Sequence, residues 1–160
     1  MRDLLLSIRP RWAQLIFDGV KTLEYRRGLP QPYYDIHRIW IYATKPVGLV
    51  LGTAEVSVWA GDVYDLSGHN GCLTREQYER YFRGAKVAYG MIIKSVDRFE
   101  RPLRLEEICV RRAPQSWMYV PGDVFSWSMD AFNAQEPKVI KNDKDNGYVA
   151  TPFTGEWEIE

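Results

Sequence analysis

A short charged segment near the N-terminus holds the residues best suited to chemistry. Lys21, Glu24, Arg26 and Arg27 fall within seven residues of one another. An arginine offers a planar fork of donors that binds phosphate or carboxylate, and a lysine beside other cations can either act as a base or hold a phosphate. Glu24 could accept a proton or orient its cationic neighbours. The same residues could also form a salt-bridge network with no further role.

The surrounding residues predict a helix followed by a strand. Pro10 suits the first turn of a helix and Gly19 its end, and the apolar residues between them recur at helical spacing. The period then changes to two, so Glu24 and Arg26 should stand side by side on the face opposite the apolar side chains. Lys21, at the start of the strand, can turn toward either face, and we expect it to contribute little to the core.

These residues carry a resemblance to a known family. The pattern Gly19-x-Lys21-x-x-Glu24-x-Arg26 is similar to the signature of ASCH domains, which are relatives of the PUA fold. Further along, the segment Pro-Gln-Ser-Trp at 114–117 resembles the Pro-Pro-Gln-Ser-aromatic segment of some ASCH-like proteins. The resemblance implies a role connected with RNA, although a fold alone does not choose a function.

The resemblance also implies an architecture. We expect an α+β protein, with a PUA-like, partly closed mixed β-barrel and two or three short flanking helices. The likeness covers about residues 2–120. We expect residues 1–160 to form a single ASCH/PUA-like domain, with 121–160 as a C-terminal extension packed on the same domain.

Two enzyme activities follow from the resemblance as alternatives. Some ASCH proteins resemble ribonucleases, in which cations hold the phosphate and a lysine or carboxylate moves protons. Another branch removes the acetyl group from N4-acetylcytidine with a lysine, a threonine three positions later and a glutamate on a later helix. Lys21 matches the lysine, Glu24 stands where the threonine would be, and Glu76 or Glu79 could be the helical glutamate. The predicted catalytic residues are Lys21, Glu24 and Glu79.

Six residues are predicted to contact a bound nucleotide: Arg26, Tyr42, Lys45, Gln115, Ser116 and Trp117. Tyr42, at the end of a predicted strand, is the best candidate for stacking on a base. The amide of Gln115 could read a base edge. Ser116 and Trp117 are expected to border the same cleft.

Composition favours a folded protein with an anionic ligand. The chain has 160 residues, 46% of them hydrophobic, and its formal net charge is zero. That charge is uneven: residues 1–45 hold eight basic and four acidic side chains, residues 75–112 hold ten and six, and residues 113–160 hold three and eight. A basic face on a neutral protein suits an anionic partner, here RNA or a modified nucleoside.

Other classes of site receive no support from the sequence. Cys72 and Cys109 are too few and too far apart for a disulfide framework or a zinc site, so we expect a reducing, cytoplasmic setting. No spacing pairs the two histidines, His37 and His69, with other metal ligands, and no nucleotide-cofactor motif is present. We therefore expect no metal and no cofactor. No apolar run is long enough to span a bilayer.

The remaining elements are predicted from period and from turn residues. A capping box, Thr74 with Gln77, opens a helix that runs to Phe82, and Gly52 should bend a long strand. The expected elements are strands over residues 4–8, 37–43, 49–59 and 86–99, short helices near 103–108 and over 122–133, and a final strand over 154–159.

The leading hypothesis is a binding domain that places RNA or a nucleotide in a basic cleft around Lys21, Glu24 and Arg26, with possible hydrolysis. A hydrolase, either a ribonuclease or an acetylcytidine amidohydrolase, is the second hypothesis. The third is a regulatory module that binds a partner without nucleic acid.

Overall fold

The computed structural model describes residues 3–66 and 68–122. The elements are β1 (Leu4–Ile8), α1 (Pro10–Phe17), β2 (Leu23–Arg26), η1 (Tyr33–Asp35), β3 (Arg38–Ala43), β4 (Leu49–Ala60), α2 (Arg75–Phe82), β5 (Tyr89–Leu103), η2 (Leu105–Ile108) and β6 (Trp117–Tyr119), where η denotes a 3-10 turn. The helix and strand predicted for residues 122–133 and 154–159 lie outside the described residues, as does most of the extension predicted from residue 121.

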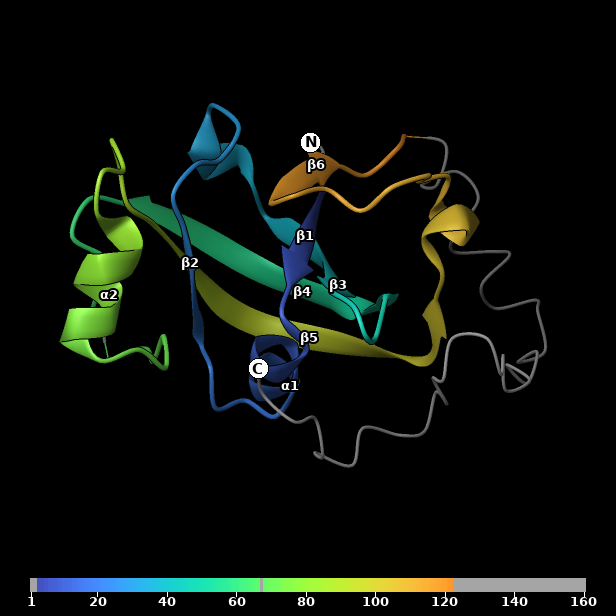
Figure 1. Ribbon diagram of the computed structural model, residues 1–160, viewed down its shortest axis with the longest axis horizontal. Coiled ribbons are helices and arrows are strands. Elements are labelled where there is room, and N and C mark those ends of the chain that lie inside the picture. Colours follow the sequence, from blue (N-terminus) through green and yellow to red (C-terminus); the bar gives the residue numbers. More distant parts are fainter. Residues whose placement is uncertain (1–2, 67, 123–160) are drawn as a thin grey trace.

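The strands form one mixed sheet of six, in the order β2-β5-β4-β3-β1-β6. Only β1 and β3 pair in parallel, and the other neighbours are antiparallel. The long strands β4 and β5 run across the molecule, and α2 lies at one end beside β2 (Figure 1). The strands curve into a half-barrel with two α-helices, so the predicted α+β architecture of a partly closed mixed barrel is confirmed.

Local chemistry explains the element boundaries. Pro10 opens α1 in its first turn, and Gly19, at φ 76°, lies just beyond its end. Thr74 accepts a hydrogen bond from the backbone of Gln77, whose side chain accepts one from the backbone of Thr74, so the predicted capping box is confirmed. At Gly52 the β4–β5 register shifts, and a Cβ there would collide with the backbone carbonyl of Asp97. The bend predicted at Gly52 therefore also needs a residue without a side chain.

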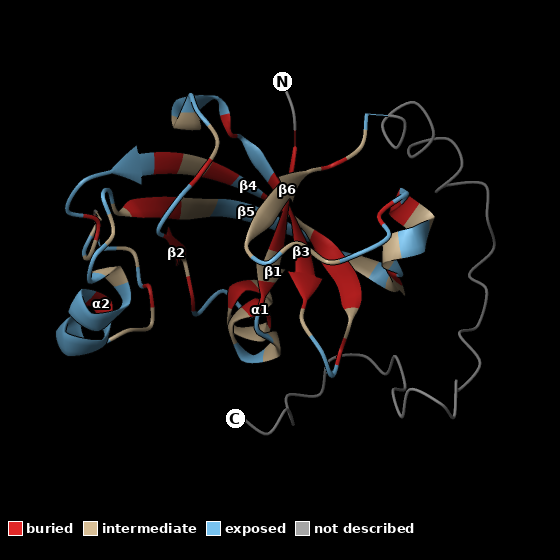
Figure 2. Cartoon of the chain, turned by 45° about the horizontal axis from the view of Figure 1, so that its top comes forward, coloured by how far each residue is buried: buried red, intermediate tan, exposed pale blue. Residues whose placement is uncertain are grey.

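Alternation along β1 and β3 separates two apolar layers. Leu4 and Leu6 belong to the main core, whereas Leu5 packs with Trp40 and Tyr42 on the other face of the sheet. Buried residues accordingly run along β1 and β3, while α2 is mostly exposed (Figure 2). A third, smaller cluster joins β2 to α2 and the loop before it: Leu23, Tyr25, Val63 and Tyr78.

Candidate functional site

Glu24 and Arg26 of the charged segment lie in β2, whose four residues are all buried, whereas Lys21 precedes the strand. Leu23 and Tyr25 enter the third apolar cluster. Glu24 and Arg26 lie on the opposite face, and Glu24 Oε1 is 2.8 Å from Arg26 Nη2. The side-by-side placement predicted from strand alternation is therefore observed.

Lys21 turns toward Glu24 and is buried, with only 3% of its surface exposed. Its Nζ donates to the backbone oxygens of Leu23 at 2.7 Å and Gly71 at 2.8 Å, and lies 3.3 Å from Glu24 Oε2. Each of its three donors thus has an acceptor within the protein. The expectation that Lys21 contributes little to the core is wrong, because a carbonyl 50 residues away in the sequence encloses its ammonium group.

Glu24 bridges Lys21 and Arg26, and we call these three residues the ionic cluster. Two cations and one carboxylate share a nearly dry environment, in which removing ions from water is costly. Such costs are common where a protein positions charge for a function. The cluster therefore marks the first candidate site.

The two ends of the Arg26 guanidinium are held differently. Nη2 is 2.8 Å from Glu24 Oε1 and donates to the carbonyl of Ser7 at 3.0 Å. Nη1 makes longer bonds to Ser116, at 3.2 Å to Oγ and 3.3 Å to the carbonyl oxygen. Nε is buried and has no hydrogen-bond partner among the described residues. Arg26 is thus anchored at one end and weakly satisfied at the other.

Ser116 reaches Arg26 because its segment is fastened to β1. β6 pairs with β1 in antiparallel register, the Ser7 backbone N–H donates to the Ser116 carbonyl at 3.0 Å, and the Ser7 hydroxyl donates to the Pro114 carbonyl at 2.6 Å. The sequence did not predict β6, which has only three residues. Gln115 is exposed, whereas Trp117 is half-buried and packs against the main core.

Tyr81 also stands beside the ionic cluster, and sequence reasoning missed it. Its hydroxyl donates to the carbonyl of Tyr25 at 3.2 Å. Desolvation by burial raises the pKa of Tyr81; Arg26 and Arg27 oppose this shift and Glu24 adds to it. The only available signal was its place on the apolar stripe of α2, which is typical of packing rather than of a site.

The helical glutamates are placed away from the cluster. Glu76 and Glu79 have side chains that are 82% and 63% exposed, and they pair with Arg80 at 2.9 Å and Arg75 at 3.2 Å on the solvent side of α2. The structure therefore brings neither carboxylate to Lys21.

Two of the predicted nucleotide contacts also lie elsewhere. Tyr42 is 5% exposed and packs in the second apolar layer. Desolvation by burial raises the pKa of its phenol, and the negative charge of Glu106 adds to this shift. Lys45 is exposed in the turn after β3. Of the nine predicted site residues, the structure gathers Lys21, Glu24, Arg26 and Ser116.

The described residues contain no group of three or more His, Cys, Asp or Glu side chains arranged to hold a metal ion. None of the helices in this part of the chain is long and apolar enough to cross a membrane.

Comparison with known proteins identifies close relatives. A curated ASCH domain-containing ribonuclease from Zymomonas mobilis is 36% identical over 123 residues, covering 72% of this chain and 82% of that protein. The crystal structure of ASCH from Zymomonas mobilis matches with 31% identity and a TM-score of 0.66, covering 78% of this chain and 92% of that one. A variant of it with a tyrosine replaced by phenylalanine matches with 27% identity and a TM-score of 0.68, covering 85% and 100%. No family model matches the chain.

Proposed function

Since the chain belongs to the ASCH domain family, we propose that it binds single-stranded RNA over the ionic cluster and cleaves it. The curated relative is a ribonuclease, and this chain has a buried, oriented cation that suits a phosphodiester. The observation that carries the proposal is the asymmetric holding of Arg26. Its anchored Nη2 fixes the plane of the guanidinium, while the long bonds of Nη1 to Ser116 can be exchanged for a phosphate oxygen.

The chemistry expected of this arrangement is electrostatic. As a ribose hydroxyl or a water attacks phosphorus, negative charge grows on the phosphate oxygens, and a donor already aimed at them stabilises the transition state without reorganising. Arg26 Nη1 and the Ser116 hydroxyl would supply these donors. Glu24 would orient Arg26, and Lys21 would hold Glu24. Tyr81, whose hydroxyl donates to the Tyr25 carbonyl at 3.2 Å, would help to hold β2 beside these donors.

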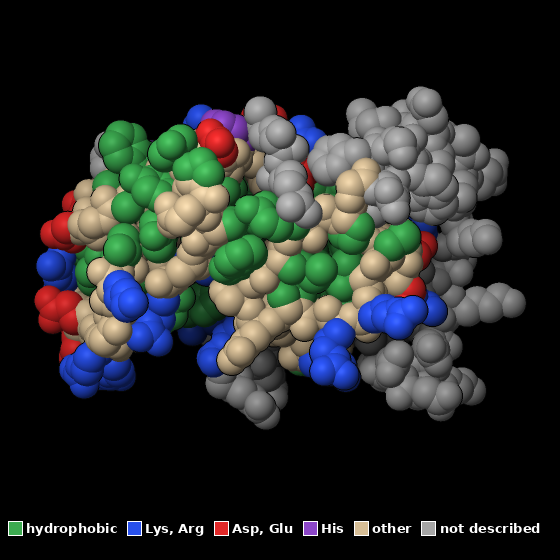
Figure 3. Space-filling model, turned by 90° about the horizontal axis from the view of Figure 1, so that it is seen from above, with side chains coloured by type: hydrophobic (Ala, Val, Ile, Leu, Met, Phe, Trp, Pro, Cys, Tyr) green, Lys and Arg blue, Asp and Glu red, His purple; other side chains and the backbone are tan. Residues whose placement is uncertain are grey.

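The charge pattern fits a ligand that lies across one face. Seen from above, Lys and Arg side chains gather along one margin of the surface, next to a broad area of apolar and backbone atoms (Figure 3). Phosphates on the margin and bases over the apolar area would match single-stranded RNA better than duplex RNA, whose bases are stacked and paired.

The acetylcytidine activity gains no support from this geometry. Glu24 occupies the position of the missing threonine and is bound between two cations. The helical glutamates face solvent.

Cleavage of an RNA oligonucleotide by wild type, Ser116→Ala and Arg26→Lys tests the proposal. Losing one transition-state donor should lower kcat by about 10²–10³-fold, and Arg26→Lys should do the same because lysine lacks the fork. Ser95→Ala, an exposed serine on β5, is the matched control and should cleave normally. Equal rates for all four proteins would remove Arg26 and Ser116 from the mechanism. Acetate release from N4-acetylcytidine without RNA cleavage would favour the amidohydrolase instead.

A further inference from the structure

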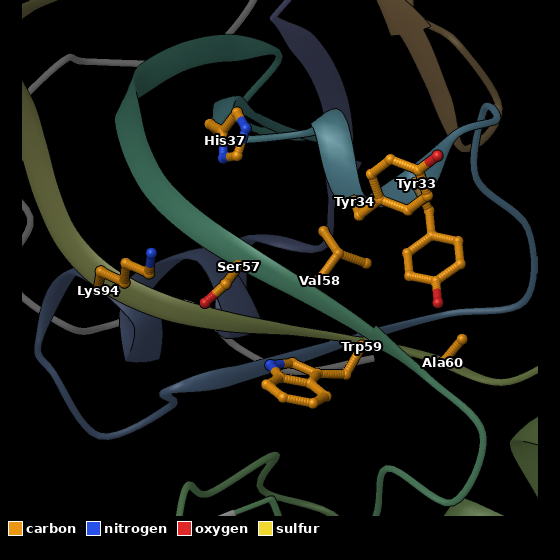
Figure 4. Close-up of a pocket in the computed structure, with 8 residues that line it drawn as sticks. All are labelled: Tyr33, Tyr34, His37, Ser57, Val58, Trp59, Ala60 and Lys94. Atoms are coloured by element: carbon orange, nitrogen blue, oxygen red, sulfur yellow. The ribbon is translucent and has the colours of Figure 1, made fainter.

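A concave region lies apart from the ionic cluster, between η1 and β4. This depression has a volume of about 320 Å³. Tyr34 and His37 border it on one side, and Ser57, Trp59 and Lys94 on the other (Figure 4). None of these residues takes part in the site described above.

The backbone of β4 is unpaired along this depression. The pairing of β4 with β3 stops at Glu55, opposite Arg38 at the start of β3, and the Val56 N–H donates to the carbonyl of His37. Beyond that point the Gly61 N–H donates to the carbonyl of Ala88, the residue before β5. Because backbone groups alternate along a strand, the N–H and C=O of residues 58 and 60 point away from β5 toward the depression. No described residue pairs with them, so they form a row of free donors and acceptors.

Two large aromatic side chains stand exposed at the same place. Trp59 is 55% exposed and Tyr34 is 65% exposed. Aromatic faces left in solvent at a concave site are typical of platforms on which unpaired bases stack. Lys94 adds a cation that can meet a backbone phosphate. A ring system and a phosphate are the two features that a nucleotide brings together.

Strand pairing relates the position of the depression to that of the ionic cluster. Arg26 pairs with Tyr89, and Tyr89 in turn pairs with Ala60 of β4. The Tyr89 ring contacts that of Tyr33 in η1, with 5.4 Å between centroids. The backbones of Arg26 and of the free edge of β4 are therefore two strand spacings apart, about 10 Å, which is a distance that one single strand of RNA can span.

We propose that this depression binds one nucleotide of single-stranded RNA outside the cleaved bond, with its base stacked on Trp59 or Tyr34 and its phosphate near Lys94. The inference rests on the proposed function, since it extends the path of the same ligand. The free backbone groups of β4 supply hydrogen bonds to the base edge, and such contacts need a base that is not already paired.

Binding of a 2′-O-methyl RNA oligonucleotide, which lacks the attacking hydroxyl, tests the subsite separately from cleavage. Fluorescence anisotropy should show Kd raised about tenfold for Trp59→Ala and little changed for Trp59→Phe, because phenylalanine still stacks. For Lys94→Ala, the slope of log Kd against the logarithm of the salt concentration should fall by about 0.7, because one phosphate contact is lost. Val87→Ala, which shortens an exposed apolar side chain elsewhere, should bind like wild type. A duplex of the same sequence should not distinguish Trp59→Ala from wild type.

The outcomes separate this inference from the ribonuclease proposal. If wild type fails to cleave unmethylated RNA while Trp59→Ala still weakens binding, the subsite stands and the ribonuclease falls. If wild type cleaves RNA while Trp59→Ala and Lys94→Ala bind RNA as wild type does, the subsite proposal is wrong. The free edge of β4 would then be better suited to pairing with an extended protein strand. If wild type binds no RNA, both are overturned.

Discussion

In the ionic cluster, Lys21, Glu24 and Arg26 are each less than a tenth exposed, whereas Trp59 and Tyr34 beside the depression are more than half exposed. The cluster's charges are bonded to one another and to backbone carbonyls. The exposed aromatic rings have no comparable role in the core. The difference teaches that the fold and the cluster depend on each other, while the depression can be altered with little effect on folding. Chemistry that needs fixed charge suits the first region, and adaptable binding suits the second.

The largest effect on folding is expected from Glu24→Ala. Removing the carboxylate leaves two buried cations without their shared partner, so the free energy of unfolding should fall by about 3–5 kcal/mol. Urea denaturation of the variant and of Glu76→Ala measures the effect. Glu76 pairs with Arg80 on the surface and its loss should cost less than about 0.5 kcal/mol. Equal losses in the two variants would mean that the cluster is no more coupled to folding than a surface pair.

Gly71→Ala should loosen the cluster from outside. A Cβ at Gly71 would overlap the ring of Tyr25, so the loop that offers its carbonyl to Lys21 must shift. We expect a loss of about 1–3 kcal/mol in thermal or chemical denaturation. Gly28→Ala is the matched control, because its Cβ would meet nothing within 4 Å. A stable Gly71→Ala protein with normal RNA cleavage would show that the contact between Lys21 and Gly71 is dispensable.

Alkaline pH should weaken the region around β2. Burial, with Tyr78 as the next cause, raises the pKa of Tyr25 above its ordinary value. The folded state therefore holds this proton more tightly than the unfolded chain does. Stability should be constant below about pH 10, the pKa of an unperturbed tyrosine, and should fall as the pH rises above it. Tyr25→Phe should flatten this loss in denaturation curves recorded between neutral and alkaline pH, and an unchanged slope would contradict the assignment to Tyr25.

The smallest effect on folding is expected at the depression. Tyr34→Ala and Trp59→Ala should each change the free energy of unfolding by no more than about 0.5 kcal/mol, because surface substitutions away from networks rarely do more. Chemical denaturation of both variants gives the comparison. A loss as large as that of Glu24→Ala would show that the exposed rings support the fold.

Local patterns predicted much of this molecule. The end of α1 at Gly19, the capping box at Thr74 and the bend at Gly52 depend on residues close in sequence, and all three were predicted correctly. The pairing of Glu24 with Arg26 follows from the two-residue period of a strand. Each of these features is set by backbone chemistry within a few residues.

The features that sequence reasoning missed depend on distant segments. Lys21 is buried because the loop that carries the Gly71 carbonyl packs over it. Tyr42 is buried because its side chain faces the second apolar layer, with Leu5 and Trp40. Glu79 satisfies the helical pattern yet lies on the exposed side of α2, which depends on how that helix docks. Sheet register and helix docking are properties of the assembled fold, so a single sequence did not reveal them.

The bond between Arg26 and Ser116 joins residues 90 positions apart, and this separation has a consequence for biosynthesis. A ribosome adds about 5–20 residues per second, so Arg26 is made roughly 5–18 seconds before its serine partner. During that interval the nascent chain carries the arginine without the strand that completes its surroundings. We expect a chain arrested before residue 114 to lack the proposed nuclease activity, so that translation itself would set the moment at which that activity can begin.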